Sequence, residues 1–335
     1  MGIRLKRGLE MREILLFLLL ALPVWAGDNQ LLISQKGESS LAFYTIEGKY
    51  LTSVPVGKHP HEMVLSADGR YAYTTDNGTL RIEQAGEGGN TVSIVDLVAR
   101  KKVGQISLGN YHRPHGIEID SQRGHLLVTT ENPDQLLIID LGSRKVIKRF
   151  DTQGKTPHIV TLGRQGKWAY VSNARSASIS AIHLSTGKTK VIPVGNRPEG
   201  SVLSTDGKEL YVANRNSNFI SVIDTERKER VADIATDRGA VRIDITPDGR
   251  TLLYALMESQ KVGFADTQTR QQTGQVALQG RPVSLNLSPD GKYAFASAQE
   301  DDTVFVISVA ERKVVRQVKT KRGAGPDPVL QISSY

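Results

Sequence analysis

Short hydrophobic runs dominate the chain from residue 30 onward, and turn residues separate them every 8–12 positions. Runs such as Glu209–Ala213 and Phe219–Asp224 hold five or six residues and are enriched in Val, Ile, Tyr and Phe. Enrichment in β-branched and aromatic residues over so short a length is typical of β-strands. Beyond the N-terminal segment, no window repeats hydrophobic residues at the helical spacing of 3.6, so we expect an all-β protein.

The runs belong to an internal repeat of about 42 residues. One copy predicts four strands, at Glu199–Ser204, Glu209–Ala213, Phe219–Asp224 and Arg230–Ala235, with Asp206-Gly207 as a two-residue hairpin turn. Four short antiparallel strands per repeat predict one blade of a β-propeller. The turn glycine recurs at Gly69, Gly124, Gly166, Gly207, Gly249 and Gly291. The first interval is longer by about 13 residues, and its excess falls in the stretch 78–89, which we interpret as an inserted loop.

The two ends of the chain together predict a closed ring. Six copies fill residues 59–325, whereas residues 30–57 supply only three strands. The segment that begins Pro326-Asp-Pro-Val-Leu matches the start of a copy, as in Arg281-Pro-Val-Ser-Leu. We therefore expect a seven-bladed propeller in which the C-terminal strand completes the first blade. Such closure removes the exposed sheet edges that favour aggregation.

The first 26 residues differ from the rest of the chain. Arg4, Lys6, Arg7 and Arg12 precede an apolar run from Ile14 to Leu22, and small residues follow near Ala26. This pattern predicts a cleaved signal peptide over residues 1–26, beginning at Met1 or at Met11, and a single propeller domain over 27–335. We therefore expect a secreted or periplasmic protein without a transmembrane segment, because the apolar run is shorter than the 20 or so residues that span a bilayer.

Composition excludes several kinds of site. The chain has no cysteine, which rules out disulfides, thiolate metal sites, cysteine nucleophiles and covalent attachment of c-type haem. Removing residues 1–26 lowers the formal net charge from +8 to +6, a mildly basic balance that permits anionic partners. No catalytic triad, P-loop or dinucleotide-binding motif is present. Any site must therefore be assembled from several blades.

The repeat resembles that of the YVTN-type β-propeller family. The resemblance rests on stretches such as Tyr170-Val-Ser-Asn, Tyr211-Val-Ala-Asn and Ile220-Ser-Val-Ile-Asp, and it covers nearly all of the chain after the signal peptide. It implies a secreted bacterial or archaeal propeller, similar to surface-layer and periplasmic proteins, a few of which bind nucleic acid or other ligands. The architecture is also similar to that of lactonase-type propellers. A fold does not fix a function.

Two repeat positions carry candidate ligand-binding residues. Each is polar in blades two to five and apolar afterwards, which predicts a polar half and an apolar half of the channel mouth. The position after the proline that opens each innermost strand gives His61, His115, His158 and Glu199, followed by Val241 and Val283. The position seven residues after the turn glycine gives Asp76, Glu131, Asn173 and Asn214. A purely structural role, with histidine capping a loop and asparagine closing a turn, is the alternative.

A third position, just before the same proline, carries a basic residue in each of blades two to seven. Arg113, Arg197, Arg238 and Arg281 belong to this series and predict a basic ring on one face. Clustered cations attract anions, so we expect a small anionic ligand. A divalent metal on His61, His115 and His158 is the alternative, with carboxylates orienting the rings. We expect no other cofactor.

Three functions remain open at this point. The first is a non-catalytic ligand- or partner-binding scaffold outside the cytoplasm, whose partner is a small anion or another extracytoplasmic protein. The second is a lactonase-type or metal-dependent hydrolase that uses the histidines and Glu199 as acid, base or metal ligands. The third is binding of single-stranded nucleic acid on the basic face, which stacking aromatics would support. Tyr111 is the one aromatic residue near the proline loops.

Overall fold

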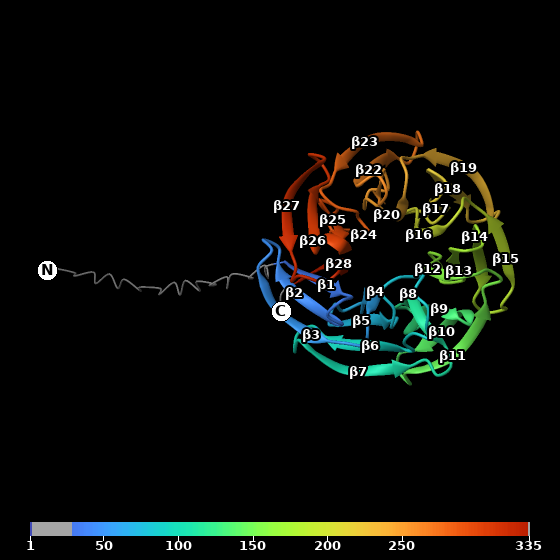
Figure 1. Cartoon of the computed structure of the whole chain (residues 1–335), viewed down its shortest axis with the longest axis horizontal. Coiled ribbons are helices and arrows are strands. Elements are labelled where there is room, and N and C mark those ends of the chain that lie inside the picture. Colours follow the sequence, from blue (N-terminus) through green and yellow to red (C-terminus); the bar gives the residue numbers. More distant parts are fainter. Residues whose placement is uncertain (2–28, 334–335) are drawn as a thin grey trace.

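Seven four-stranded antiparallel sheets form a ring around a central channel in the computed structural model, which describes residue 1 and residues 29–333 (Figure 1). Blades two to seven each take four consecutive strands, beginning with β4–β7 and ending with β24–β27. The first blade has the order β28-β1-β2-β3, so it combines the two ends of the chain. The predicted seven-bladed propeller, closed by the C-terminal strand, is thus confirmed. The predicted signal peptide lies outside the described residues.

The strands are short throughout, as the hydrophobic pattern predicts. Their bounds are β1 Gln30–Gln35, β2 Ser40–Thr45, β3 Tyr50–Pro55, β4 Pro60–Leu65, β5 Tyr71–Asp76, β6 Thr91–Asp96, β7 Lys101–Ser107, β8 His112–Asp120, β9 His125–Asn132, β10 Asp134–Asp140, β11 Lys145–Asp151, β12 Pro157–Leu162, β13 Trp168–Asn173, β14 Ser178–His183, β15 Thr189–Pro193, β16 Pro198–Leu203, β17 Glu209–Asn214, β18 Phe219–Asp224, β19 Glu229–Ala235, β20 Ala240–Ile245, β21 Thr251–Leu256, β22 Lys261–Asp266, β23 Gln271–Ala277, β24 Ser284–Leu287, β25 Tyr293–Ala298, β26 Thr303–Ser308, β27 Lys313–Lys319 and β28 Pro326–Ile332. A single 3₁₀ turn, η1 (Gln299–Asp301), interrupts the strands in the described part of the chain.

The core lies between neighbouring blades rather than at the centre of the ring. The two middle strands of each blade are almost fully buried, because both faces of each sheet pack against a neighbouring sheet. The outermost strands, such as β7 and β27, instead place every second residue in solvent. Apolar clusters accordingly join residues of adjacent blades, for example Leu253 and Phe264 of blade six with Phe305 of blade seven.

Ring closure rests on a paired and buried strand. β28 runs antiparallel to β1, with Ile332 opposite Gln30, Leu330 opposite Leu32 and Val329 opposite Ile33. Val329 is fully buried and packs against residues of both blade one and blade seven, including Phe295. The last strand therefore joins the two ends of the chain into one packed seam.

One local feature differs from what the sequence predicts. The hairpin at Gly207 has a four-residue loop rather than a two-residue turn, because the Ser204 amide donates to the Glu209 carbonyl. The Asp206 carboxylate accepts hydrogen bonds from the Ser204 hydroxyl and the Lys208 amide, and these bonds stabilise the four-residue loop.

None of the described residues forms a helix long and apolar enough to cross a membrane.

Candidate ligand site at the channel mouth

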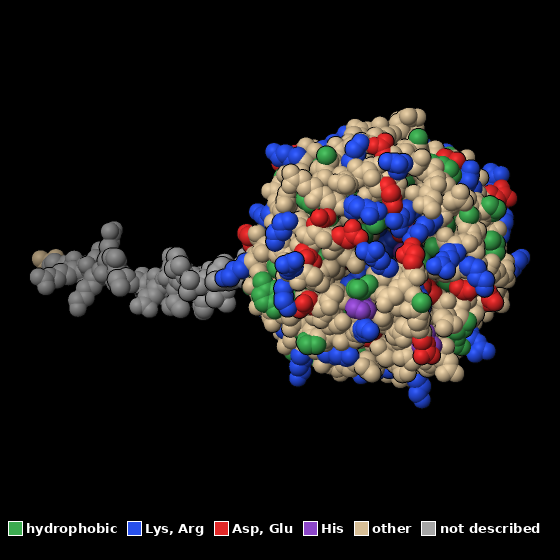
Figure 2. Space-filling view, viewed as in Figure 1, with side chains coloured by type: hydrophobic (Ala, Val, Ile, Leu, Met, Phe, Trp, Pro, Cys, Tyr) green, Lys and Arg blue, Asp and Glu red, His purple; other side chains and the backbone are tan. Residues whose placement is uncertain are grey.

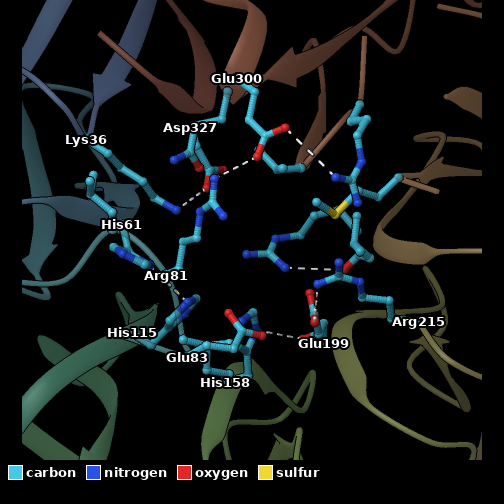
Figure 3. A pocket seen from close by; sticks show the side chains of 18 of the residues that line it. Lys36, His61, Arg81, Glu83, His115, His158, Glu199, Arg215, Glu300 and Asp327 are labelled. Atoms are coloured by element: carbon cyan, nitrogen blue, oxygen red, sulfur yellow. Dashed lines mark hydrogen bonds and ion pairs between the residues drawn. The ribbon is translucent and has the colours of Figure 1, made fainter. Parts of the chain in front are cut away.

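A cavity of about 310 Å³ occupies one mouth of the central channel (Figure 3). Every blade contributes to its lining, which holds His61, His115, His158, Glu199, Val241 and Val283 from the innermost-strand position, together with Lys36, Leu80, Arg81, Ile82, Glu83, Arg197, Arg215, Arg242, Met257, Arg281, Gln299, Glu300 and Asp327. The structure thus brings together six residues from one repeat position. Figure 2 shows Lys and Arg side chains gathered around a central hollow on this face, with Asp and Glu side chains between them.

The local backbone explains why that repeat position faces the channel. In blades two to five the residue before the opening proline has a positive φ, as at His59, Arg113, Thr156 and Arg197. This left-handed residue turns the chain sharply from the outer strand of one blade into the innermost strand of the next. Proline then follows with its fixed φ and starts the innermost strand. The next side chain is delivered to the channel mouth in each blade.

His61, His115 and His158 form one contiguous row, which we call the histidine row. His61 Nδ1 lies 3.0 Å from His115 Nε2, and the rings of His115 and His158 stack with centroids 3.8 Å apart. All three side chains are buried. Burial holds the pKa of His61 and His115 well below the usual range, and burial together with the charge of Arg242 lowers that of His158 to about 3. The row is therefore neutral at physiological pH.

Two buried ion pairs contribute Lys36, Asp327 and Arg242 to the lining of the same cavity. Arg242 of β20 reaches across to Glu62 of β4, with Nη2 and Oε1 2.5 Å apart, and Lys36 pairs with Asp327 at 2.5 Å. All four side chains are largely buried. Such pairs are stable only when the partners stay together, because either charge alone would be buried without compensation.

Glu199 is the anion at the edge of the histidine row. Its Oε1 accepts from Arg197 Nε at 2.5 Å and from Arg215 Nη1 at 3.3 Å. Burial opposes its ionisation, but the surrounding His158, Arg215 and Arg197 outweigh that effect and lower the pKa of Glu199 to about 2. Glu199 is thus a permanent carboxylate near neutral pH and has no proton to donate as a general acid.

The inserted loop covers the cavity, and we call residues 78–89 the strap. Its Arg81 pairs with Glu300 of blade seven at 2.8 Å, and its Glu83 pairs with Arg197 of blade five at 2.7 Å. Its middle is held by Arg113, which donates to the carbonyls of Ile82 and Gln84 at 3.0 and 2.7 Å. A loop from blade two is therefore pinned across the mouth on the far side of the ring.

The second predicted series does not reach the cavity. Asp76 accepts from the Gly57 amide and from the hydroxyls of Thr91 and Ser93. Its place beside that amide leaves no room for a side chain, because a Cβ on Gly57 would lie 2.1 Å from the Asp76 Cγ. Asn173 and Asn214 are likewise turned to neighbouring serines, and Asn214 also donates to the Phe219 carbonyl. These three residues close turns within their own blades.

Glu131 and two members of the basic series also lie away from the cavity. Glu131 accepts from Arg113 Nε at 2.8 Å, while burial raises the pKa of its carboxyl to about 7 against the opposing charge of Arg113. Arg113 is used by this pair and by the strap, and Arg238 does not line the cavity. Of the four predicted arginines, only Arg197 and Arg281 face it. The predicted basic ring is therefore incomplete, because at this mouth acidic residues alternate with the cations.

No group of three or more His, Asp or Glu side chains is placed to hold a metal ion anywhere in residues 29–333. The histidine row shows why: its members are stacked and bonded to one another in sequence rather than converging on one point. The predicted metal ligands are thus neighbours, and a metal at this row remains a prediction.

Several residues of the site carry no signal in the sequence. Arg242 and Glu62 lie 180 positions apart, and each follows a channel-facing residue in its own blade. Arg215 and Glu258 pair at 2.7 Å across blades five and six. Their partners are fixed by ring closure, so no local motif indicates them. The strap residues were recognisable only as an insertion.

Comparisons with known proteins support the fold and identify the family. No curated protein sequence matches the chain. Among solved structures, a functionally unknown protein from Desulfotomaculum acetoxidans is 13% identical with a TM-score of 0.77, covering 92% of this chain and 100% of that one. The periplasmic gluconolactonase PpgL of Pseudomonas aeruginosa is 13% identical with a TM-score of 0.75, covering 92% and 99%. The dihydro-heme d1 dehydrogenase NirN is 16% identical with a TM-score of 0.64, covering 88% and 64%. At such identities these likenesses show the fold alone.

The sequence itself matches one family model. Residues 119–333, which run from within blade three to the closing strand, match the model described as Cytochrome D1 heme domain. None of these matches carries the YVTN-type name, so that finer resemblance stays a prediction. The chain belongs to the cytochrome D1 heme domain family.

Proposed function

We propose that the protein is an extracytoplasmic, non-catalytic binding protein whose channel mouth takes a small carboxylate-bearing ligand. The observation that carries this proposal is Arg281, which lines the cavity with a guanidinium that makes no hydrogen bond to any described residue. Its nearest carboxylate oxygens belong to Glu258 and Glu300 and lie 3.7 and 3.9 Å away. A guanidinium is built to bind a carboxylate through two parallel hydrogen bonds.

The charge balance of the cavity supports one bound anion rather than a polyanion. Its lining holds six cations and four carboxylates, so the excess of positive charge is small. Beside Arg281, the buried Arg242 Nε also lacks a hydrogen-bond partner among the described residues. A guanidinium without a hydrogen-bonded acceptor can bind an anion through charge-assisted hydrogen bonds. Binding of nucleic acid has less support, because the acidic residues around the mouth repel a phosphate backbone.

The family description makes a haem the first tetrapyrrole to test. The donor set fits such a group: the residues that would hold it are His158, a neutral imidazole, and Arg281, which suits a haem carboxylate. A bound haem would supply a redox-active iron. This chain's own residues would bind and orient the carboxylates, and the strap, with Leu80 and Ile82 in the cavity wall, would exclude water.

A pair of arginine variants tests the proposal directly. Arg281 and Arg238 belong to the same predicted basic series, but only Arg281 lines the cavity. We expect calorimetric titration with gluconate, and absorbance titration with haem, to detect binding by at least one of them. Arg281→Ser should weaken that binding about tenfold or more, while Arg238→Ser leaves it unchanged. Absence of binding to both compounds, or equal effects of the two substitutions, would refute the proposal.

Lactone hydrolysis is the second candidate. The observation in its favour is that a neutral imidazole, His158, shares one cavity with arginines able to stabilise an oxyanion. In this scheme His158 would accept a proton from an attacking water, and Arg281 would hold the developing negative oxygen. The structurally similar PpgL is described as a gluconolactonase, which makes glucono-lactone the natural substrate to try.

The hydrolase is tested by following acid release from glucono-δ-lactone. Turnover above the spontaneous rate that is lost in His158→Phe but retained in His183→Phe would establish this candidate, since His183 lies outside the cavity. A wild-type rate equal to the spontaneous rate, with and without added Zn²⁺, would eliminate it and leave the binding function.

A further inference from the structure

The hydrogen bonds of the histidine row fix which ring nitrogens carry protons. His61 Nε2 lies 2.8 Å from the Thr79 carbonyl oxygen, which can only accept, so His61 Nε2 must be the donor. A neutral His61 then has a bare lone pair on Nδ1. The partner at 3.0 Å, His115 Nε2, must therefore be protonated and donate to it. His115 consequently carries its lone pair on Nδ1.

The same reasoning applies to His158. Its Nδ1 lies 3.3 Å from the Glu199 carbonyl oxygen, again an obligate acceptor, so Nδ1 carries the proton and Nε2 the lone pair. The stacked rings of His115 and His158 thus hold two bare nitrogens, His115 Nδ1 and His158 Nε2. No described residue donates to either, and His115 Nδ1 is fully buried. A buried acceptor left without a donor is costly.

The opposite side of the cavity has the complementary chemistry. The histidine row comes from blades two to four, whereas Arg197, Arg215, Arg242 and Arg281 come from blades five to seven (Figure 3). Arg281 and Arg242 Nε are donors without hydrogen-bonded acceptors. His115 Nδ1 and Arg242 Nε are fully buried, so a ligand in the cavity can reach only His158 Nε2 as a free acceptor and Arg281 as a free donor. A ligand that satisfies both must present a hydrogen-bond donor at one end and an anionic acceptor at the other.

We propose that the ligand is a polyhydroxylated carboxylic acid, with a hydroxyl group that donates to His158 Nε2 and a carboxylate bound by Arg281. This inference rests on the proposed function and narrows it to a class of ligand. A fully deprotonated inorganic anion does not fit, because it would place lone pairs against lone pairs at the histidine row. A plain fatty carboxylate leaves His158 Nε2 without a hydrogen-bond donor.

Three six-carbon compounds separate the possibilities. Gluconate has both hydroxyls and a carboxylate, hexanoate has only the carboxylate, and sorbitol has only hydroxyls. We expect calorimetry on the full mature protein to give gluconate an affinity at least about tenfold above that of either other compound. Equal binding of gluconate and hexanoate would overturn this inference and leave the proposed function intact. Failure of gluconate and hexanoate to bind would overturn this inference, and failure of haem to bind as well would remove the proposed function.

The main alternative is a metal ion bound by the two unprotonated nitrogens, and a separate experiment tests it. Protein treated with a chelator should bind gluconate unchanged. Binding that disappears on chelation and returns with Zn²⁺ would mean that the lone pairs serve a metal, which overturns the inference.

The tautomers can be read without a ligand. ¹⁵N NMR of histidine-labelled protein should show bare nitrogens at His61 Nδ1, His115 Nδ1 and His158 Nε2, and any other assignment overturns the inference. His158→Phe, which keeps the ring volume, should reduce the preference for gluconate over hexanoate. His183→Phe, outside the cavity, should leave that preference unchanged.

Discussion

The closing seam of the propeller can be weakened by a single substitution of known size. Val329 of β28 is fully buried between blade one and blade seven, and Val329→Ala removes two methyl groups from that seam. At about 0.8 kcal/mol per buried carbon, with an added cost for the cavity left behind, the free energy of unfolding should fall by about 2–3 kcal/mol. With an unfolding entropy of about 2.1 cal/mol/K per residue, a propeller of about 300 residues should then melt at a temperature lower by roughly 3–5 °C.

A matched control separates the seam from general loss of apolar surface. Val315 of β27 is 40% exposed on the outer strand, so Val315→Ala should change the free energy of unfolding by less than about 0.5 kcal/mol. Both variants should be compared by differential scanning calorimetry. Equal melting temperatures for the two variants would show that packing at the seam contributes no more to stability than an exposed residue does.

Truncation tests the same seam more severely. Deleting residues 326–335 removes Val329 and Ile332 from the core, leaves Lys36 without Asp327, and exposes the edge of β1. An unpaired buried charge alone costs about 3–5 kcal/mol, so the total reaches the 5–15 kcal/mol that stabilises a typical domain. The truncated protein should aggregate or unfold. A truncated protein that melts at the wild-type temperature would refute ring closure.

Three further outcomes follow from individual side chains. Burial raises the pKa of the Glu118 carboxyl to about 7, so between about pH 4.5 and 7 the folded state holds a proton that the unfolded state has lost. Stability should therefore fall as the pH rises through this range, and Glu118→Gln should reduce that slope in denaturant titrations, with Glu131 contributing the rest. Arg113→Ala should release the strap and speed hydrogen exchange of residues 78–89, whereas Arg238→Ala should not. Gluconate affinity should weaken only modestly between 50 and 500 mM salt, because Glu83, Glu199 and Glu300 already partly neutralise the arginines around the cavity. A steep loss of affinity would instead indicate a ring of unpaired basic residues.

The fold was predictable because a propeller repeats one local pattern. Each blade carries its own turn glycine and strand signals, and the unmatched strand at Pro326 identified the seam. The strand pattern underestimated the loop at Gly207, since a Ser-x-Asp-Gly sequence is compatible with both a two-residue and a four-residue loop. The choice depends on the hydrogen bonds that the Asp206 carboxylate makes.

The candidate site was predictable only in part. Repeat position correctly placed His61, His115, His158 and Glu199 at one cavity, because equivalent residues of a symmetric ring lie at equivalent depths. The residues seven positions after the glycine do not line this cavity, because Asp76, Asn173 and Asn214 form hydrogen bonds within or beside their own blades, as Asp76 does with the Gly57 amide. The Arg242–Glu62 pair forms because blades two and six face each other across the channel, and the local sequence around either residue does not predict that arrangement.

Blade-to-blade contacts on the opposite edge show the same limit. Arg100 lies over the ring of Phe43, Lys228 over Trp168 and Arg312 over Phe264, so cations of the last turn in one blade cover an aromatic ring of the preceding blade. From the sequence alone, these cations would be interpreted as solvent-exposed charges in turns. Their contact with an aromatic ring becomes visible only once neighbouring blades are packed together.

The central claim is that the cavity beneath the strap is the ligand site. A crystal structure of the mature protein grown with gluconate tests it most directly. The account predicts density between the histidine row and Arg281, with hydroxyl oxygens within hydrogen-bond distance of His158 Nε2 and the carboxylate on the guanidinium. Gluconate bound elsewhere on the propeller, or a reversed molecule with its carboxylate against the imidazoles, would contradict it.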